Sequence, residues 1–93
     1  MGIVFEWDGN KAKTNVLKHH VSFEEATTVF SDHRSLTIDS PLRVVHEKRF
    51  VTTGISTKMR ILVVVHTERG DKIRIISARP ASRKERKQYN YET

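Results

Sequence analysis

The sequence has no cysteine, only two prolines and four glycines, and no long apolar run. The absence of cysteine excludes disulfides and thiolate metal sites. No stretch approaches the ~18 apolar residues that a membrane-spanning helix requires, and the N-terminus lacks the pattern of a signal peptide. Zinc-type ligand spacing and a glycine-rich phosphate loop are also missing. We therefore expect a cytoplasmic protein that needs no metal ion or cofactor and does not enter a membrane.

The length of 93 residues allows one modest core but not two, and the chain has no repeats, low-complexity segments or domain linkers, so we expect a single domain over residues 1–93. Positive charge is what the sequence has in excess, with 17 Lys and Arg against 11 Asp and Glu, a formal net charge of +6. Residues 1–59 hold eight basic and seven acidic residues, whereas residues 60–93 hold nine and four. This imbalance favours a polyanionic partner for the last third of the chain, although a merely solvated surface has the same composition.

Apolar periodicity and turn residues predict an α+β fold. Asp8 is a suitable N-cap for a helix at residues 9–19, and Ser22 with Glu25 forms a capping box for a second helix at about residues 23–30. Neighbouring β-rich segments favour an antiparallel sheet of four to five strands, with two N-terminal helices and a C-terminal helix. The expected strands are residues 3–7, 36–39, 49–55, 60–67 and 72–79, and residues 42–48 have no clear pattern.

The strongest functional pattern begins at the end of the last strand. Arg79 ends that strand, Pro80 breaks it, and Ser82 with Glu85 forms a capping box that starts a basic helix. An arginine near a helix N-terminus is suited to binding phosphate. If the pleat stays regular to the end of the strand, Arg79 shares the face of Ile73 and Ile75.

Two further positions are candidates for acid–base chemistry. Arg60 and His66 have even spacing along one strand, so they share the face of Leu62 and Val64. His66 can act as an acid or a base near neutral pH, although a histidine at a strand end more often forms a hydrogen bond at the margin of the core. Glu47, in the segment without a clear pattern, is the second candidate, together with its neighbour His46.

Four segments of the chain carry a resemblance to a known family: FEWDGNKAKTNVLKHHVSFEEATTVF, RFVTTGIS, ILVVVHTERGDKIRIISAR and ASRKERKQY. They resemble the BrnT toxins of bacterial type II toxin–antitoxin systems. The resemblance covers nearly the whole chain except residues 31–47. One departure is His20, because the family usually has glycine after the first helix, at a C′ position where φ is usually positive.

The resemblance implies a RelE-like fold and an endoribonuclease that inhibits translation. It also implies a partner, a BrnA-like antitoxin with a ribbon-helix-helix domain. The protein would then bind operator DNA only through this antitoxin. Metal-independent RNA cleavage needs a base, an acid and a group that stabilises the charge of the phosphate. We predict that Arg79 stabilises the phosphate with support from Arg60 or Arg83, and that His66 or Glu47 acts as acid or base.

The residues predicted to position RNA are basic side chains with one aromatic ring: Lys18, Arg83, Lys84, Lys87 and Tyr89. Tyr89 has two interpretations, because its ring can stack on a base or anchor the last helix to the sheet. The alternative function is a non-catalytic module that binds nucleic acid or a protein through the same basic face.

Overall fold

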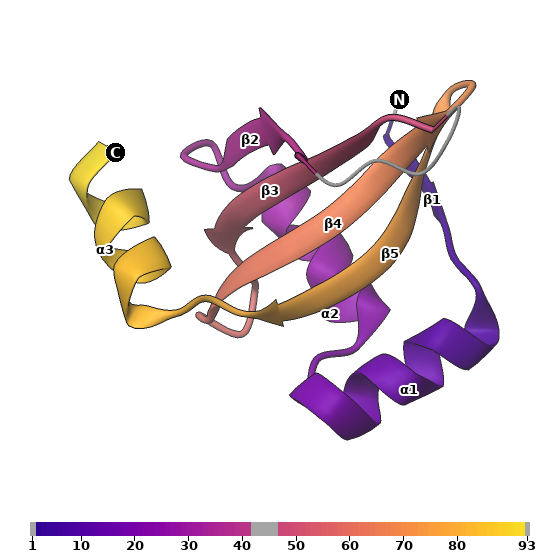
Figure 1. Ribbon diagram of the computed structural model, residues 1–93, viewed down its shortest axis with the longest axis horizontal. Helices are drawn as coiled ribbons and strands as arrows, with labels where there is room; N and C mark the ends of the chain where they lie inside the picture. The colour runs from indigo at the N-terminus through magenta and orange to yellow at the C-terminus, as the bar shows by residue number, and fades with distance from the viewer. Residues whose placement is uncertain (1, 42–46, 93) are drawn as a thin grey trace.

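The computed structural model describes residues 2–41 and 47–92 of the chain. Five strands form one sheet in the order β1-β5-β4-β3-β2 (Figure 1). The strands are β1 (Val4–Glu6), β2 (Leu36–Asp39), β3 (Arg49–Ile55), β4 (Ile61–Arg69) and β5 (Lys72–Pro80). The helices are α1 (Gly9–His19), α2 (Phe23–Thr27) and α3 (Arg83–Glu92), and a 3-10 turn, η1 (Thr28–Ser31), follows α2. The predicted α+β class is confirmed.

The prediction of a purely antiparallel sheet is wrong at one edge. β1 pairs in parallel with β5, from Val4 opposite Lys72 to Glu6 opposite Arg74, so the sheet is mixed. The pattern of neighbouring segments does not reveal this pairing, because β1 and β5 are far apart in the sequence. Burial of aromatic side chains favours it: Phe5 packs against Phe30 with ring centroids 5.2 Å apart. The other three strand pairs are antiparallel, as expected.

Short-range capping signals define the N-terminal helices. The Asp8 carboxylate accepts from the backbone N–H groups of Asn10 and Lys11, which begins α1. The Ser22 hydroxyl accepts from the N–H of Glu25, which begins α2. The second expected helix is shorter than predicted, because α2 has five residues and continues as η1. His20 has the left-handed φ of 57° that the C′ position requires, without the glycine.

The hydrophobic core lies on one face of the sheet. In Figure 1, α2 lies behind the strands, and the opposite face of the sheet is turned toward the viewer. We call this opposite face the open face. None of the helices in the described part of the chain is long and apolar enough to cross a membrane. The core joins α2, η1 and the central strands through Val21, Phe23, Ala26, Val29, Leu62, Val64, Ile75 and Ala78.

A β-bulge in β5 decides which residues of that strand face the core. His66 lies opposite Ile75 and Val65 lies opposite Ser77, so Ile76 is the extra residue. Beyond the bulge Ala78 faces the core, and Arg79 lies opposite Val63 on the open face. The prediction that Arg79 shares the face of Ile73 and Ile75 is therefore wrong, because the pleat is not regular.

Asn15 of α1 holds β5 just beyond the bulge. Its side-chain Nδ2 donates to the carbonyl of Ala78 at 2.7 Å, and its Oδ1 accepts from the Ala78 N–H at 3.1 Å. The amide thus satisfies both backbone groups of Ala78, as a neighbouring strand would. Asn15 is buried, and the arrangement fixes the end of β5 from which Arg79 extends.

Candidate functional site

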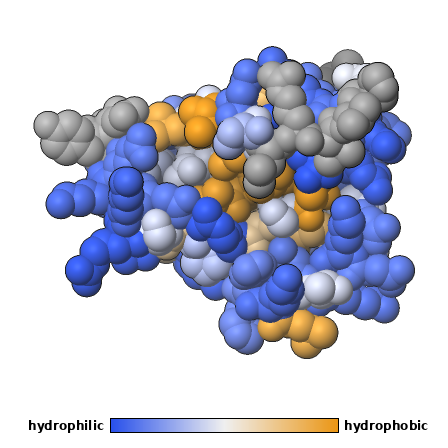
Figure 2. Space-filling model, viewed as in Figure 1, coloured by the Kyte–Doolittle hydropathy of each residue, from blue (hydrophilic) through white to orange (hydrophobic). Residues whose placement is uncertain are grey.

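The open face has an aliphatic middle between charged ends. Residues directly opposite one another on neighbouring strands lie on the same face of a sheet, so the strand pairing defines three transverse rows. Figure 2, in the same view as Figure 1, shows apolar atoms in the middle of this face and hydrophilic atoms around them. The rows are Leu36, Thr53, Val63 and Arg79; then Ile38, Val51, Val65 and Ser77; then Arg49, Thr67, Arg74 and Glu6.

Arg79 ends the first row and forms an ion pair with the helix that follows it. Its Nη1 donates to Glu85 Oε1 at 2.7 Å and its Nη2 donates to Glu85 Oε2 at 2.9 Å. The predicted capping box is present, because the Ser82 N–H donates to Glu85 Oε1 and the Glu85 N–H donates to the Ser82 hydroxyl. These bonds, from Arg79 above all, lower the pKa of Glu85 to about 2. Glu85 is therefore ionised at neutral pH.

A groove of about 450 Å³ runs beside this ion pair, between α3 and the strands β2 and β3. Its floor includes Leu36 and Ile38 of β2, and its wall includes Glu85 and Tyr89 of α3. Ile38 is 63% exposed, an unusual degree for a large aliphatic side chain. The groove thus joins an accessible apolar surface to the Arg79 end of the open face.

The basic residues predicted to position RNA lie on two sides of the open face. Arg83, Lys84 and Lys87 of α3 are exposed and form no ion pair with any described residue. Lys18 of α1 borders a separate hollow that includes Ile76 and Ser77 of β5. The structure therefore does not bring these cations into one cluster: three lie on α3, which follows Arg79 in the chain, and Lys18 lies on α1.

Tyr89 anchors α3 to the rest of the fold. Its side chain is buried, and its hydroxyl donates to Asp32 Oδ2 at 2.6 Å. The same carboxylate oxygen accepts from the backbone N–H of Ile55 at 2.9 Å, and Gly54 permits this close approach because a Cβ there would lie 3.2 Å from Asp32 Oδ2. Burial raises the pKa of Tyr89 to about 12, with a further contribution from its bond to Asp32. Of the two interpretations of Tyr89, the structure shows the anchor.

Arg60 lies on the other face of the sheet, against α2. Its Nε donates to Glu25 Oε2 at 3.0 Å, its Nη2 contacts Glu25 Oε1, and Nη2 also donates to the carbonyl of His20. The side chain of Glu25 is only 2% exposed, and the bonds from Arg60 lower its pKa. Arg60 therefore neutralises a buried carboxylate and does not lie beside Arg79 in support.

His66 also faces the core, as its spacing with Arg60 predicted. It is 4% exposed, packs edge-on against Phe30 and stacks on Phe50. Its Nε2 lies 2.8 Å from the Thr52 hydroxyl, and Nδ1 has no hydrogen-bond partner among the described residues. Burial lowers its pKa to about 4, so the ring is neutral at pH 7. An acid–base role beside Arg79 does not fit this position, since the two residues are on opposite faces.

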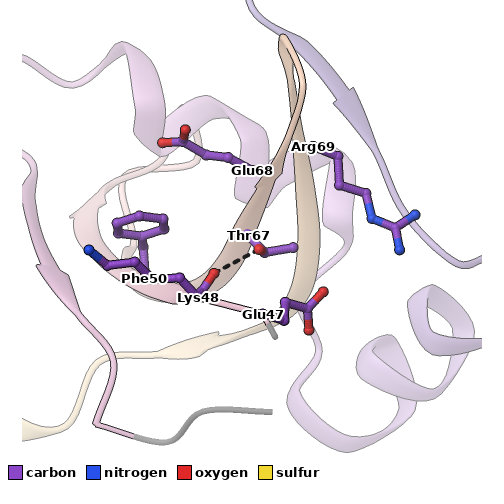
Figure 3. A pocket seen from close by; sticks show the side chains of 6 residues that line it. All are labelled: Glu47, Lys48, Phe50, Thr67, Glu68 and Arg69. Atoms are coloured by element: carbon purple, nitrogen blue, oxygen red, sulfur yellow. Dashed lines mark hydrogen bonds between the residues drawn. The ribbon is translucent and has the colours of Figure 1, made fainter. Parts of the chain in front are cut away.

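Glu47 lies at the far end of the open face. It contacts Arg49 at 3.4 Å and borders a hollow of about 440 Å³. Figure 3 shows Phe50 and Glu68 on one side of the strands, and Glu47 and Arg69 on the other. Thr67, which also lines the hollow, is four residues along β4 from Val63, or roughly 13 Å. Glu47 and Arg79 thus share a face but not a site, and His46 lies outside the described residues.

Two residues that hold the site together were not found from the sequence. Asn15 contacts a residue 63 positions away, and Asp32 contacts Tyr89 across 57 positions. Neither residue belongs to a local motif that would reveal so distant a partner. Within the described ranges, no group of three or more His, Asp or Glu residues is arranged to hold a metal ion.

Together these features define a small α+β protein with an arginine and a basic helix at one end of an open sheet face. The family described as "Ribonuclease toxin, BrnT, of type II toxin-antitoxin system" matches residues 7–85. The chain therefore belongs to the BrnT family of ribonuclease toxins.

The fold is also found among solved structures. An example is the 1.1 Å crystal structure of the Brucella abortus ribonuclease toxin BrnT, with a TM-score of 0.64 and 24% sequence identity. The match covers 88% of the present chain and all of the Brucella chain. A comparison with curated proteins found no match. The wider RelE-like relationship stays a prediction.

Proposed function

We propose that this protein is a cytoplasmic endoribonuclease toxin that cleaves RNA bound across the open face and so inhibits translation. The observation that carries the proposal is the position of Arg79. It lies on the open face at the start of the basic helix α3, and its side chain is 44% exposed. Family membership supports the ribonuclease activity.

The proposed RNA path follows the charges and the aliphatic rows. The exposed cations of α3 and Lys18 contact phosphates, which gives affinity without reading sequence. The aliphatic middle of the face, with Val51 and Val65, offers a surface on which the faces of bases and riboses can pack. Tyr89 contributes indirectly, by holding α3 in place through Asp32.

The proposed reaction is metal-independent. The ribose 2′-oxygen attacks the neighbouring phosphorus, the bond to the 5′-oxygen breaks, and a proton passes from the 2′-hydroxyl to the leaving oxygen by way of solvent. Arg79, supported by Arg83, stabilises the negative charge that develops on the phosphate oxygens. Neither His66 nor Glu47 lies beside Arg79, and Glu85 is a weak base because its pKa is about 2. Charge stabilisation is therefore the main contribution of this site.

The test compares purified wild-type protein with Arg79→Ala on cellular RNA in the presence of EDTA. Loss of a donor to a developing oxyanion typically lowers the rate by about 100- to 1000-fold. Arg69→Ala is the matched control, because Arg69 is an exposed arginine near Glu6, 3.8 Å away, at the other end of the sheet. Cleavage by Arg79→Ala at the wild-type rate would contradict the assignment. RNA binding by the wild type without any cleavage would instead establish the non-catalytic alternative.

We also propose that a BrnA-like ribbon-helix-helix antitoxin inhibits the protein by covering the open face, and that operator DNA is bound only through the antitoxin. A type II toxin family implies an antitoxin. The exposed Ile38 beside cationic α3 suits an amphipathic segment that carries acidic side chains. Saturating antitoxin should stop cleavage in the same assay, and undiminished cleavage would show that it binds elsewhere.

A further inference from the structure

The Arg79–Glu85 ion pair uses only part of the guanidinium group. A guanidinium has five N–H donors in a fixed plane. Glu85 accepts one bond from Nη1 and one from Nη2, and the Pro80 carbonyl accepts a longer one, 3.3 Å, from Nη1. The Nε–H and the second N–H of Nη2 have no partner among the described residues. These two donors lie side by side along one edge of the plane.

The unpaired edge has the geometry of an oxyanion site. Two parallel N–H groups of an arginine can donate to two oxygens of one phosphate. Glu85 occupies the adjacent edge of the group, between Nη1 and Nη2, and uses different N–H bonds, so phosphate binding at the free edge does not require the ion pair to break. The carboxylate therefore directs the free edge instead of competing for it.

Glu85 is itself held in place relative to the sheet. Its Oε1 accepts from the Ser82 N–H at 2.8 Å, and α3 is anchored to η1 and β3 through the Tyr89–Asp32–Ile55 contacts. A half-exposed arginine without such a partner samples many rotamers, and fixing them has an entropic cost. In this protein the Arg79 side chain loses that rotamer entropy during folding, before a ligand binds.

We infer that Glu85 is a positioning residue for RNA cleavage: it holds Arg79 so that the Nε–Nη2 edge faces the reacting phosphate. This inference rests on the proposed function, in which Arg79 contacts that phosphate. It assigns to Glu85 a role beyond capping α3, and it makes the capping box and the phosphate site one connected unit.

The test is the effect of Glu85→Gln on kcat and KM for a labelled single-stranded RNA that the wild type cleaves. Glutamine keeps an oxygen for the Ser82 N–H, but its amide cannot accept two bonds from Arg79. Loss of a supporting partner costs about 10- to 100-fold at metal sites, and we expect kcat to fall about 10-fold. KM should stay equal or decrease, because the variant removes a negative charge from an RNA-binding surface.

Ser82→Ala is the matched control, since it removes the other half of the capping box without contacting Arg79. A fall in kcat no larger than that of Ser82→Ala would show that Glu85 is only a cap. A rise in kcat would show that Glu85 blocks Arg79. The double variant Arg79→Ala, Glu85→Gln should cleave RNA no more slowly than Arg79→Ala alone, because Glu85 acts only through Arg79. Additive losses would contradict the inference, whereas an active Arg79→Ala protein would contradict the proposed function itself.

Discussion

Two arginine–glutamate pairs lie on opposite faces of the sheet. Their difference in burial distinguishes an ion pair that stabilises the fold from one whose arginine can still bind a ligand. Both Arg60–Glu25 and Arg79–Glu85 join both carboxylate oxygens to one guanidinium. The Glu25 side chain is 2% exposed and also accepts from the Ser56 hydroxyl, whereas Glu85 is 32% exposed. A buried carboxylate makes its arginine indispensable to folding. An exposed one leaves its arginine free to bind a ligand.

The largest expected effect is on folding, and it separates the two pairs directly. Arg60→Ala leaves the charge of Glu25 buried without its main partner, which typically costs 3–5 kcal/mol. We expect about 3 kcal/mol, the low end, because Arg60 is 36% exposed. Arg79→Ala removes an exposed pair and should lower the free energy of unfolding by less than about 1 kcal/mol. Urea unfolding of the two variants and the wild type measures both values.

The control for this comparison is one double variant that carries both Arg60→Met and Glu25→Leu. Replacing both partners of a buried ion pair by apolar residues is often neutral, so the double variant should recover most of the stability lost in Arg60→Ala. Equal destabilisation by Arg60→Ala and Arg79→Ala would remove the distinction between the two faces.

The next effect is a pH dependence that belongs to the core face. Burial lowers the pKa of His66 to about 4, while an unfolded histidine titrates near 6.5. Between these pH values the unfolded state binds more protons than the folded state. The contribution of His66 to the free energy of unfolding is therefore complete above pH 6.5 and is lost as the pH falls toward 4. The slope should approach about 1.4 kcal/mol per pH unit. Urea unfolding at several pH values tests this expectation.

His66→Phe is the control, because phenylalanine fills a similar space between Phe30 and Phe50 without titrating. The variant should lose stability at neutral pH, where the bond to Thr52 is missing, but should show a shallower slope between pH 4 and 6.5. An unchanged slope would show that other groups cause the acid sensitivity.

The smallest effect concerns the cations at the edge of the open face. Replacing Lys84 and Lys87 with alanine should weaken RNA binding and make its salt dependence shallower by about 0.7 of a unit of slope per lost phosphate contact. Measuring Kd for a single-stranded RNA at several salt concentrations gives this slope. The control is the exposed pair Lys13, on α1, and Lys72, at the opposite end of β5 from α3, whose replacement should leave the slope nearly unchanged. Equal slopes for the two double variants would remove α3 from the RNA path.

Local signals in the sequence were sufficient to place most of the elements. The bounds of α1, β2 and β3 match the prediction, and the capping residues Asp8, Ser22 and Ser82 act as expected. Such features depend on residues a few positions apart, and their chemistry is visible in the sequence.

The distant contacts were beyond prediction from the sequence, and they decide the site. Glu25 and Arg60 are 35 positions apart, so nothing near Arg60 indicated that its charge is already neutralised. His66 carried the right spacing for the core face, but its burial depends on Phe30 and Phe50 from two other elements. The basic helix was predicted correctly as a surface feature because its composition alone keeps it solvated.

The extra residue Ile76 gives β5 two successive frames of side-chain alternation. Before it, odd-numbered positions such as Ile75 enter the core; after it, even-numbered positions such as Ala78 do so. If the strand kept the same residues but formed no bulge, regular alternation would exchange the inward and outward sets beyond Ile75. Arg79 would then point at the packed helices, and Ala78 at solvent. The bulge at Ile76 is thus as much a part of the proposed chemistry as the arginine itself.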